Sequence, residues 1–473
     1  MVYHSQNDAG SESAPSLIPL PNDDPIAAIA TASGRASIGV IRVSGKNLKE
    51  FCSCITGGFA AKPRMAHYLP ILDADGSLID QAIVIYFCAP HSYTGEDIVE
   101  LQGHGGPAVM QLLLKRCLDV GKPFRLRLAQ PGEFTLRAYL NDKMDLAQAE
   151  AVADMIDASS SAAAKAAAAS LSGAFSSEVQ RLVALITEVR VLVEATLDFP
   201  EEEIEFIEKY QVRDTLSSIK SQLNSVLQTS RQSSYLREGL KVVLAGEPNV
   251  GKSSLLNALF GAEIAIVTDI AGTTRDRIKE TLHIDGVPIQ ITDTAGLRET
   301  TDQIESIGIE RTWQAIAESD LILDIVDARN PQSLFEQWSN RAEVSKKDIL
   351  QVRNKSDLLA TESINLGNDD RSIIVSAKTG QGINDLKSII LSRADRQLGD
   401  VSPWLGRQRH VVALEAAAEH LDRAIEHAGF DDRVLDLLAE ELRLAHDALG
   451  AITGQMSADD MLGQIFSSFC IGK

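Results

Sequence analysis

The chain has 473 residues, a formal net charge of −21 and a hydrophobic fraction of 44%. This length predicts several domains, and the hydrophobic content is sufficient for several buried cores. The acidic balance argues against a protein that wraps DNA or coats an anionic membrane unaided, although it allows a local basic groove or a partner that holds a nucleic acid.

The N-terminal segment and the cysteines give the first expectations. Residues 1–24 are polar, which predicts a weakly ordered arm and no signal peptide. No apolar run reaches about 18 residues, so we expect no membrane span and a cytoplasmic protein. The five cysteines are sparse, as is typical of reduced thiols. Cys52 and Cys54 form a lone C-x-C, for which metal binding is a weak alternative.

Two patterns follow the arm. Residues 25–143 mix turns with short β-branched runs such as Ile38–Val43 and Gln81–Phe87, which predicts an α+β domain. Residues 144–237 contain almost no glycine or proline and include an alanine-rich run, which predicts a helical segment. We expect Pro200 to end one long helix of this segment.

Residues 238–394 alternate apolar strands with helical stretches, which predicts βαβ units and a mainly parallel sheet. The expected strands are Lys241–Ala245, Ile289–Thr292, Leu321–Val326, Ile349–Val352 and Ile373–Val375. The expected helices beyond them are Val411–His427, Val434–Leu449 and Ala458–Phe469. The fold class is therefore multidomain α+β and α/β, with one helical domain (144–237 and 395–473) interrupted by an inserted Ras-like domain.

A phosphate-binding loop opens the inserted domain. Gly246-Glu-Pro-Asn-Val-Gly-Lys-Ser253 fits G-x-x-x-x-G-K-[ST] and lies between the first expected strand and a helix at Ser254–Phe260. Its glycines allow backbone N–H groups to face phosphate oxygens, and the helix N-terminus adds positive potential. Lys252 is expected to reach the β- and γ-phosphates, and Ser253 to hold Mg²⁺.

Three further motifs follow in order, each at the end of an expected strand. Asp293-Thr-Ala-Gly296 can hold Mg²⁺ through water and sense the γ-phosphate. The Asp357 carboxylate of Asn354-Lys-Ser-Asp357 can accept from guanine N1–H and the 2-amino group together. Adenine lacks both donors, so a buried Asp357 predicts GTP rather than ATP. Ser376-Ala-Lys378 can offer a backbone N–H to guanine O6.

The hydrolytic residues depart from the Ras-like pattern, because Leu297 stands where a water-orienting glutamine is expected. Glu305 is one candidate to polarise water, and a solvated surface charge is the simpler reading of its spacing. Thr274 is a candidate switch threonine on Mg²⁺. No arginine finger is assured: a monovalent cation among the oxygens of Asn249 and residues 268–275 is one substitute, and Arg275 is the other.

At this point the chain resembles the bacterial MnmE (TrmE) family of tRNA-modification GTPases, from Ile26 to Lys473. The resemblance is carried by Gly246–Ser254, Thr268–Arg275, Asp293–Arg298, Gly103–Gly106, Pro131–Phe134, Asn141–Lys143 and the terminal Phe469–Lys473. The last four residues of the chain, C-x-G-K, are particularly specific.

The resemblance implies a K⁺-activated GTPase whose two G domains face each other in a homodimer. K⁺ would be held by the Asn249 side chain and by the carbonyl groups of Thr268, Ile270 and Thr273, and Mg²⁺ by Ser253 and Thr274. Glu305 matches the catalytic acidic residue of the family, against the simpler reading. The expected nucleotide contacts are Asn249, Val250, Gly251, Lys252, Ser253, Ser254, Thr268, Asp269, Ile270, Ala271, Gly272, Thr273, Thr274, Asp293, Thr294, Ala295, Gly296, Asn354, Lys355, Ser356, Asp357, Ser376, Ala377 and Lys378.

The resemblance also implies a folate-binding N-terminal domain that dimerises. Its matching positions for 5-formyltetrahydrofolate, or a related tetrahydrofolate, are Arg42, Glu100 and Lys143, with Lys473 nearby. Cys470 matches a terminal cysteine that the modification needs, and Lys473 could lower the pKa of this thiol.

The implied function joins these parts. With a flavoprotein partner, MnmG (GidA), in a heterotetramer or larger complex, the family adds an aminomethyl or carboxymethylaminomethyl group to carbon 5 of the wobble uridine of certain tRNAs. The implied cofactors are GTP, Mg²⁺, K⁺ and the folate, with FAD and NADH on the partner and ammonium or glycine as co-substrate. The alternative is a regulatory or ribosome-assembly GTPase that acts as a switch without chemistry on tRNA.

Overall fold

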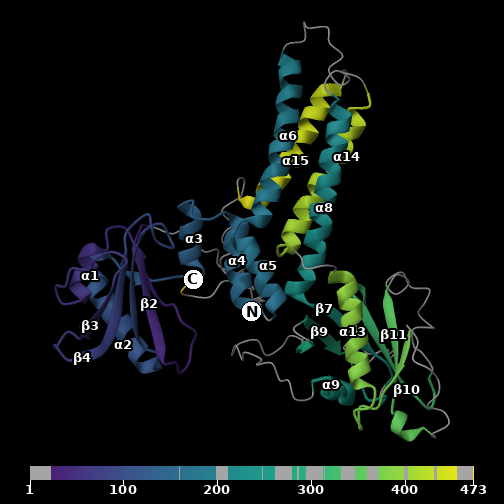
Figure 1. Ribbon diagram of the computed structural model, residues 1–473, viewed down its shortest axis with the longest axis horizontal. Helices are drawn as coiled ribbons and strands as arrows, with labels where there is room; N and C mark the ends of the chain where they lie inside the picture. Colours follow the sequence, from purple (N-terminus) through teal and green to yellow (C-terminus); the bar gives the residue numbers. More distant parts are fainter. Residues whose placement is uncertain are drawn as a thin grey trace, which may run out of the picture. The chain divides into compact units, whose positions relative to one another are not determined.

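The computed structural model describes residues 23–158, 160–198, 211–247, 249–260, 280–284, 287–293, 313, 315–331, 347–359, 371–398, 403–430, 434–454 and 472. The chain divides into two compact units (Figure 1). The first comprises Met1–Ala153 and Asp447–Lys473, and the second comprises Asp154–His446. The finer division into an arm, an N-terminal domain, a helical domain and a G domain stays a prediction.

The first unit contains a six-stranded sheet in the order β3-β4-β5-β2-β1-β6. Its strands are β1 (Ile26–Ile29), β2 (Ile38–Gly45), β3 (Ala66–Leu72), β4 (Leu78–Phe87), β5 (Asp97–His104) and β6 (Arg127–Leu128). All neighbouring strands are antiparallel except β1 and β6. The register pairs Arg42 of β2 with Glu100 of β5, which places these side chains on the same face.

Helix α2 (Pro107–Gly121), with α1 (Lys49–Ile55) packed against it, covers the other face of this sheet. The unit also contains the 3₁₀ turn η1 (Lys122–Phe124), α3 (Glu133–Leu140) and the start of α4 (Leu146–Asp157). Val99 and Leu101 are buried in one core with Met110 and Leu113 of α2. Because side chains alternate along a strand, Glu100 between them points away from α2.

The motif Pro131–Phe134 supplies a buried ion cluster at the start of α3. Glu133 accepts hydrogen bonds from Arg127 at 2.6 Å and from Arg137 at 3.0 Å, and Arg137 also pairs with Glu96 at 3.0 Å. Burial acts to raise the pKa of Glu133, but these hydrogen bonds outweigh it, and the pKa is lowered. The cluster attaches α3 to the loop before β5.

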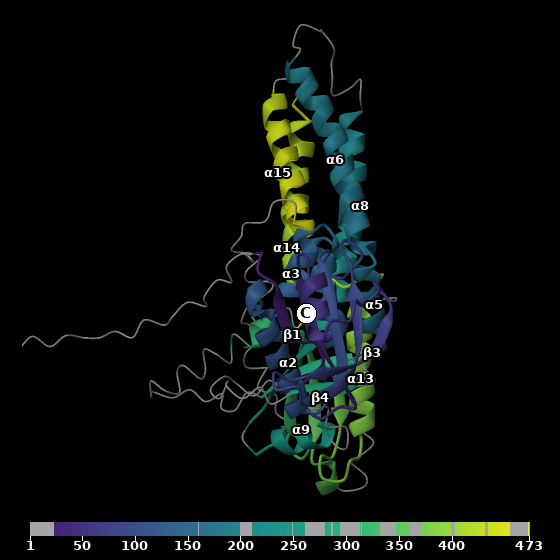
Figure 2. The same ribbon diagram turned by 90° about the vertical axis from the view of Figure 1, so that its left-hand side faces the viewer.

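The second unit contains a helical bundle whose long helices run side by side in both views (Figure 1, Figure 2). Its helices are α5 (Ser161–Leu171), α6 (Ala174–Asp198), α8 (Val212–Glu238), α14 (Gln408–His427) and α15 (Leu435–Thr453), the last ending in the first unit. The alanine-rich run lies in α5, where the Ser160 hydroxyl caps the helix by accepting from Ala163 N at 3.0 Å.

A second six-stranded sheet in this unit has the order β12-β11-β10-β7-β9-β8. Its strands are β7 (Leu240–Ala245), β8 (Glu280–Ile284), β9 (Val287–Asp293), β10 (Leu321–Asp327), β11 (Asp348–Asn354) and β12 (Ser372–Ile374). Only β8 and β9 pair antiparallel. The other elements are α9 (Lys252–Phe260), the 3₁₀ turn η2 (Ser356–Leu358) and α13 (Ile383–Leu398).

The predicted fold class is confirmed, because all five expected strands of the parallel sheet occur within one residue or two of their predicted limits. Pro200 and Ala458–Phe469 lie outside the described residues. No helix in the described ranges is long and apolar enough to cross a membrane.

Candidate functional site

The phosphate loop connects β7 to α9 and packs tightly on the neighbouring strand. Gly246 has φ +150°, and a Cβ atom there would lie 2.2 Å from the carbonyl oxygen of Ile325 on β10. Gly251 has φ +95°, and a Cβ atom there would lie 2.4 Å from Asn354 Nδ2. Both positions therefore require glycine, for conformation and for space. This is the close backbone approach that a phosphate cradle needs.

The side chains of this loop are placed for phosphate and cation chemistry. Lys252 Nζ donates to the carbonyl oxygens of Gly246 at 2.7 Å and Glu247 at 3.2 Å, so the ammonium group lies over the loop. Ser253 is exposed in the first turn of α9, as a serine that binds Mg²⁺ must be. Asn249 is exposed at the turn of the loop, with φ +64°.

Asn354 joins three of the predicted motifs. Its side chain is buried, donates to the carbonyl oxygen of Val250 at 2.9 Å and accepts from the N–H of Ala377 at 3.0 Å. One amide group thus links the phosphate loop to both loops that are expected to bind the base. The parallel topology makes this possible, because the carboxyl ends of β7, β11 and β12 lie at the same edge of the sheet.

Asp357 is held in place by the neighbouring loop. Ser376 Oγ donates to Asp357 Oδ1 at 2.7 Å, and Ser356 N donates to the carbonyl oxygen of Val375 at 3.1 Å. Asp357 is exposed, so the prediction of a buried carboxylate is wrong for the protein alone. The residue lies in a turn at the open edge of the sheet, where its second oxygen remains available to a base.

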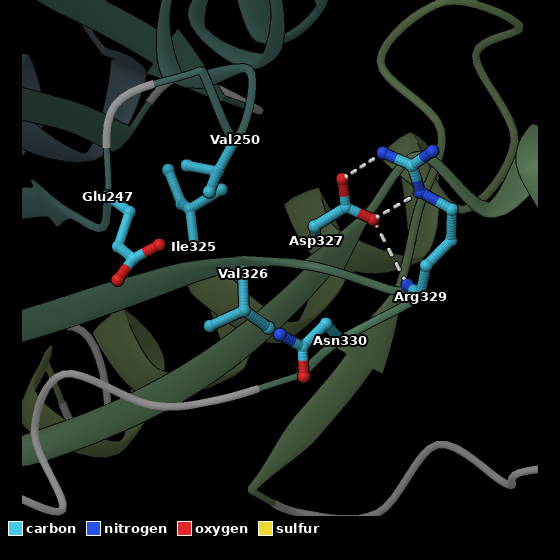
Figure 3. Close-up of a pocket in the computed structure, with 7 residues that line it drawn as sticks. All are labelled: Glu247, Val250, Ile325, Val326, Asp327, Arg329 and Asn330. Carbon is cyan, nitrogen blue, oxygen red and sulfur yellow. Dashed lines mark hydrogen bonds and ion pairs between the residues drawn. The ribbon is translucent and has the colours of Figure 1, made fainter.

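An ion cluster that the sequence analysis missed lies beside these loops. Asp327, the last residue of β10, pairs with Arg329 at 2.6 Å and with Lys355 at 3.0 Å. The hydrogen bond from Arg329 is the main cause that holds the pKa of Asp327 well below its usual value. Asp327 and Arg329 line a cavity of about 380 Å³ together with Glu247 and Val250 of the phosphate loop (Figure 3).

Most of the remaining predicted positions of the G domain lie outside the described residues. Asp293 ends β9, and its backbone is in register with Leu244 of β7, next to the phosphate loop. The positions that lie outside the described residues are Thr268, Asp269, Ile270, Ala271, Gly272, Thr273, Thr274, Arg275, Thr294, Ala295, Gly296, Leu297 and Glu305.

In the first unit, residues distant in sequence meet at a second cavity. Arg42 pairs with Glu100 at 2.9 Å, and Glu100 and Lys143 line a cavity of about 360 Å³. The guanidinium of Arg42 lies 5.5 Å from the ring centroid of Tyr93 and 5.9 Å from that of Phe134. These distances permit cation–π contacts that orient Arg42 beside the cavity.

The wall of this cavity includes residues that the sequence analysis did not name. They are Arg64, Phe87, His91, Ser92, Tyr93 and Ile98. Tyr93 OH lies 2.8 Å from Thr135 Oγ1 on α3, so the helix also positions the ring. Lys143 Nζ donates to the carbonyl oxygen of Pro90 at 3.1 Å. No local motif marks these six residues, because they come from three separate segments.

The terminal motif is described at one position. Gly472 is buried with φ +101°, and a Cβ atom there would lie 2.4 Å from the carbonyl oxygen of Ile29 on β1. Cys470 and Lys473 lie outside the described residues.

Within the same unit, burial raises the pKa of the Cys52 thiol, in the C-x-C pair, to about 11. The part of the chain that is described holds no group of three or more potential metal ligands.

Comparison with known proteins decides the family. A family model described as the MnmE helical domain matches residues 146–470, and one described as the GTP-binding protein TrmE N-terminus matches residues 25–143. The chain is 58% identical over 449 residues to tRNA modification GTPase MnmE of Bordetella avium strain 197N, covering 95% of this chain and 99% of that one. The chain belongs to the MnmE family of tRNA modification GTPases.

Other MnmE relatives are similar over the same length. The enzyme named tRNA modification GTPase MnmE from Paraburkholderia xenovorans strain LB400 is 52% identical over 461 residues, covering 96% of this chain and 99% of that one. A crystal structure of Aquifex aeolicus Era bound to GDP and AlF4− is 25% identical with a TM-score of 0.27, covering 38% of this chain and 65% of that one. As an MnmE-family member, the chain is a GTP-binding protein and a GTP hydrolase that acts in tRNA modification.

Proposed function

We propose that this protein is a K⁺-activated GTPase that works with the flavoprotein MnmG. Together they install a (carboxymethyl)aminomethyl group at carbon 5 of the wobble uridine, position 34, of certain tRNAs. The carbon of this group comes from a tetrahydrofolate one-carbon unit, with FAD and NADH on the partner. Cys470 takes part in the modification, and GTP hydrolysis drives opening and closing of paired G domains.

The cavity beside Arg42 carries the part of this proposal that goes beyond GTP hydrolysis. A GTPase switch has no need of a second polar cavity in an N-terminal domain. Here Glu100 and Lys143, two of the positions matched to folate binding, line one cavity, and Arg42, the third, is paired with Glu100 at 2.9 Å beside it. Aromatic side chains and a carboxylate are suited to a reduced pterin, whose ring edge carries several N–H donors. The residues present therefore fit the folate.

The hydrolytic part rests on the phosphate loop and its exposed side chains. Ser253 would hold Mg²⁺ together with Thr274, and Asn249 would hold K⁺ together with three carbonyl groups of residues 268–273. The exposure of the Ser253 and Asn249 side chains supports both roles. A cation at this place would supply the positive charge that an arginine finger supplies elsewhere. Glu305 would orient the attacking water. In the proposed homodimer, two such sites face each other.

Replacing Na⁺ by K⁺ at equal ionic strength is expected to raise the rate of GTP hydrolysis at least about tenfold, because an oxygen cage of fixed size discriminates between the ions. Asn249→Gly removes one ligand and keeps a residue that tolerates φ +64°. This variant should lose the K⁺ effect and still bind GTP. Steady-state phosphate release in KCl and in NaCl measures the K⁺ effect, and titration with a fluorescent nucleotide measures GTP binding by the variant. Equal rates for the unaltered protein in the two salts would contradict the assignment.

Deleting the gene is expected to leave the wobble uridines of the affected tRNAs without the carbon-5 substituent. Mass spectrometry of tRNA nucleosides measures this directly, and the wild-type gene on a plasmid should restore the modification. Unchanged wobble uridines in the deletion strain, accompanied by accumulation of immature ribosomal subunits, would instead support the alternative of a ribosome-assembly switch.

A further inference from the structure

The cavity beside Arg42 carries more positive charge than its one carboxylate can balance. Arg64, Lys143 and Glu100 line the cavity, and Glu100 is already paired with the adjacent Arg42 at 2.9 Å. Across the described part of the chain, no carboxylate lies within ion-pair distance of Arg64 or Lys143. In a chain with a net charge of −21, a cavity wall with two uncompensated cations indicates an anionic ligand.

Arg64 is held at the cavity by its backbone. It has φ +59°, and its N–H donates to the carbonyl oxygen of Tyr86 on β4 at 2.7 Å. The preceding Pro63 forms an isolated bridge with the same tyrosine. The backbone of Arg64 is therefore fixed beside the sheet, while its side chain is exposed and lines the cavity.

The cavity thus has two chemically different parts. Phe87, Tyr93 and Ile98 provide apolar surface that suits planar rings. Arg64 and Lys143 provide the charges, and a guanidinium group is the side chain best suited to bind a carboxylate with two parallel hydrogen bonds. A folate has the same division, since its pterin and aminobenzoyl rings end in one or more glutamate residues.

We propose that Arg64 binds carboxylates of the folate glutamate tail and makes the site prefer polyglutamylated folates. This inference rests on the proposed folate function of the cavity. Each added glutamate brings a further carboxylate to the uncompensated cations, so affinity rises with tail length. The preference should weaken at high salt, because exposed charges are screened.

The test measures binding of 5-formyltetrahydrofolate as the monoglutamate and as the pentaglutamate to the full chain by titration calorimetry. The unaltered protein should bind the pentaglutamate about tenfold more tightly. Arg64→Gln should remove most of this preference and change monoglutamate affinity less. The matched control is Lys115→Gln, an exposed cation on α2 at the opposite face of the sheet, which should keep the preference.

The outcomes separate this inference from the proposed function. Tight binding of both forms with equal affinity would overturn the tail preference and leave the folate function standing. A preference that persists in Arg64→Gln would overturn the role of Arg64. If neither form binds to the unaltered protein, the folate function fails, and the inference fails with it. Circular dichroism of Arg64→Gln should give the spectrum of the unaltered protein, because the substituted side chain is exposed.

Discussion

Asp357→Asn is expected to reverse the base preference of the G domain from guanine to xanthine. The carboxylate accepts from both guanine N1–H and the 2-amino group, and an asparagine amide presents one acceptor and one donor instead. Ser376 Oγ donates to Asp357 Oδ1, so the amide oxygen of the variant should remain on the side of Ser376. Its NH₂ group then faces the base, where it opposes the guanine amino group and matches the carbonyl group of xanthine.

The expected loss of GTP affinity is large. Removing one charged hydrogen bond and opposing two donors reduces the free energy of GTP binding by about 3 kcal/mol or more, which raises the dissociation constant roughly 100-fold. Xanthosine triphosphate should bind the variant more tightly than GTP does, and should support hydrolysis at a rate near that of the unaltered protein with GTP. Fluorescent nucleotide titrations and phosphate release measure the two effects.

Leu358→Ala provides the matched control. Leu358 follows Asp357 in the turn η2 and its side chain is exposed, so its truncation should leave GTP affinity unchanged. A similar loss of affinity in the control would mean that the loop is disturbed in general. Unchanged GTP affinity in Asp357→Asn would show that Asp357 does not read the base.

Asn354→Ala is expected to reduce both the stability of the G domain and its affinity for any guanine nucleotide. The substitution removes the amide that joins Val250 and Ala377, and leaves one carbonyl group and one N–H without their partners. Each unsatisfied buried group costs about 1–3 kcal/mol. The phosphate loop and the base loops then lose the link that aligns them.

The measurable effects are a lower thermal midpoint, by several degrees, and weaker binding of GTP and GDP alike. Asn354→Asp keeps the acceptor for Ala377 N–H and loses the donor to Val250. Its thermal midpoint and nucleotide affinity should therefore lie between those of the unaltered protein and those of Asn354→Ala. Asn257→Ala, an exposed asparagine on α9, controls for the loss of an amide near the loop. Normal stability and affinity in Asn354→Ala would show that the link has no role.

The phosphate loop and the loops at Asn354 and Ser376 could be predicted from the sequence because each binding function lies within a short contiguous segment. Their glycines, charges and flanking strands are neighbours along the chain, so spacing alone is informative. The parallel sheet then places all of them at one edge. The structure added the links between them, in particular the amide of Asn354 and the cluster of Asp327, Arg329 and Lys355.

The cavity of the first unit could not be derived in this way. Arg42 and Glu100 meet because β2 and β5 pair in one particular register, and a shift by one residue would place them on opposite faces. Tyr93 and Arg64 reach the cavity from separate segments whose positions depend on packing. A family resemblance could suggest three of these positions, but it gave no indication of Arg64.

The sequence by itself thus determined the class of nucleotide, the parallel sheet and the helical character of the segments around it, since these depend on local spacing and periodicity. Only the tertiary structure decided which isolated charges meet, which of them are neutralised and which remain available to a ligand. The physical reason is that pairing of charges depends on distances in space, and those are set by strand register and helix packing rather than by separation along the chain.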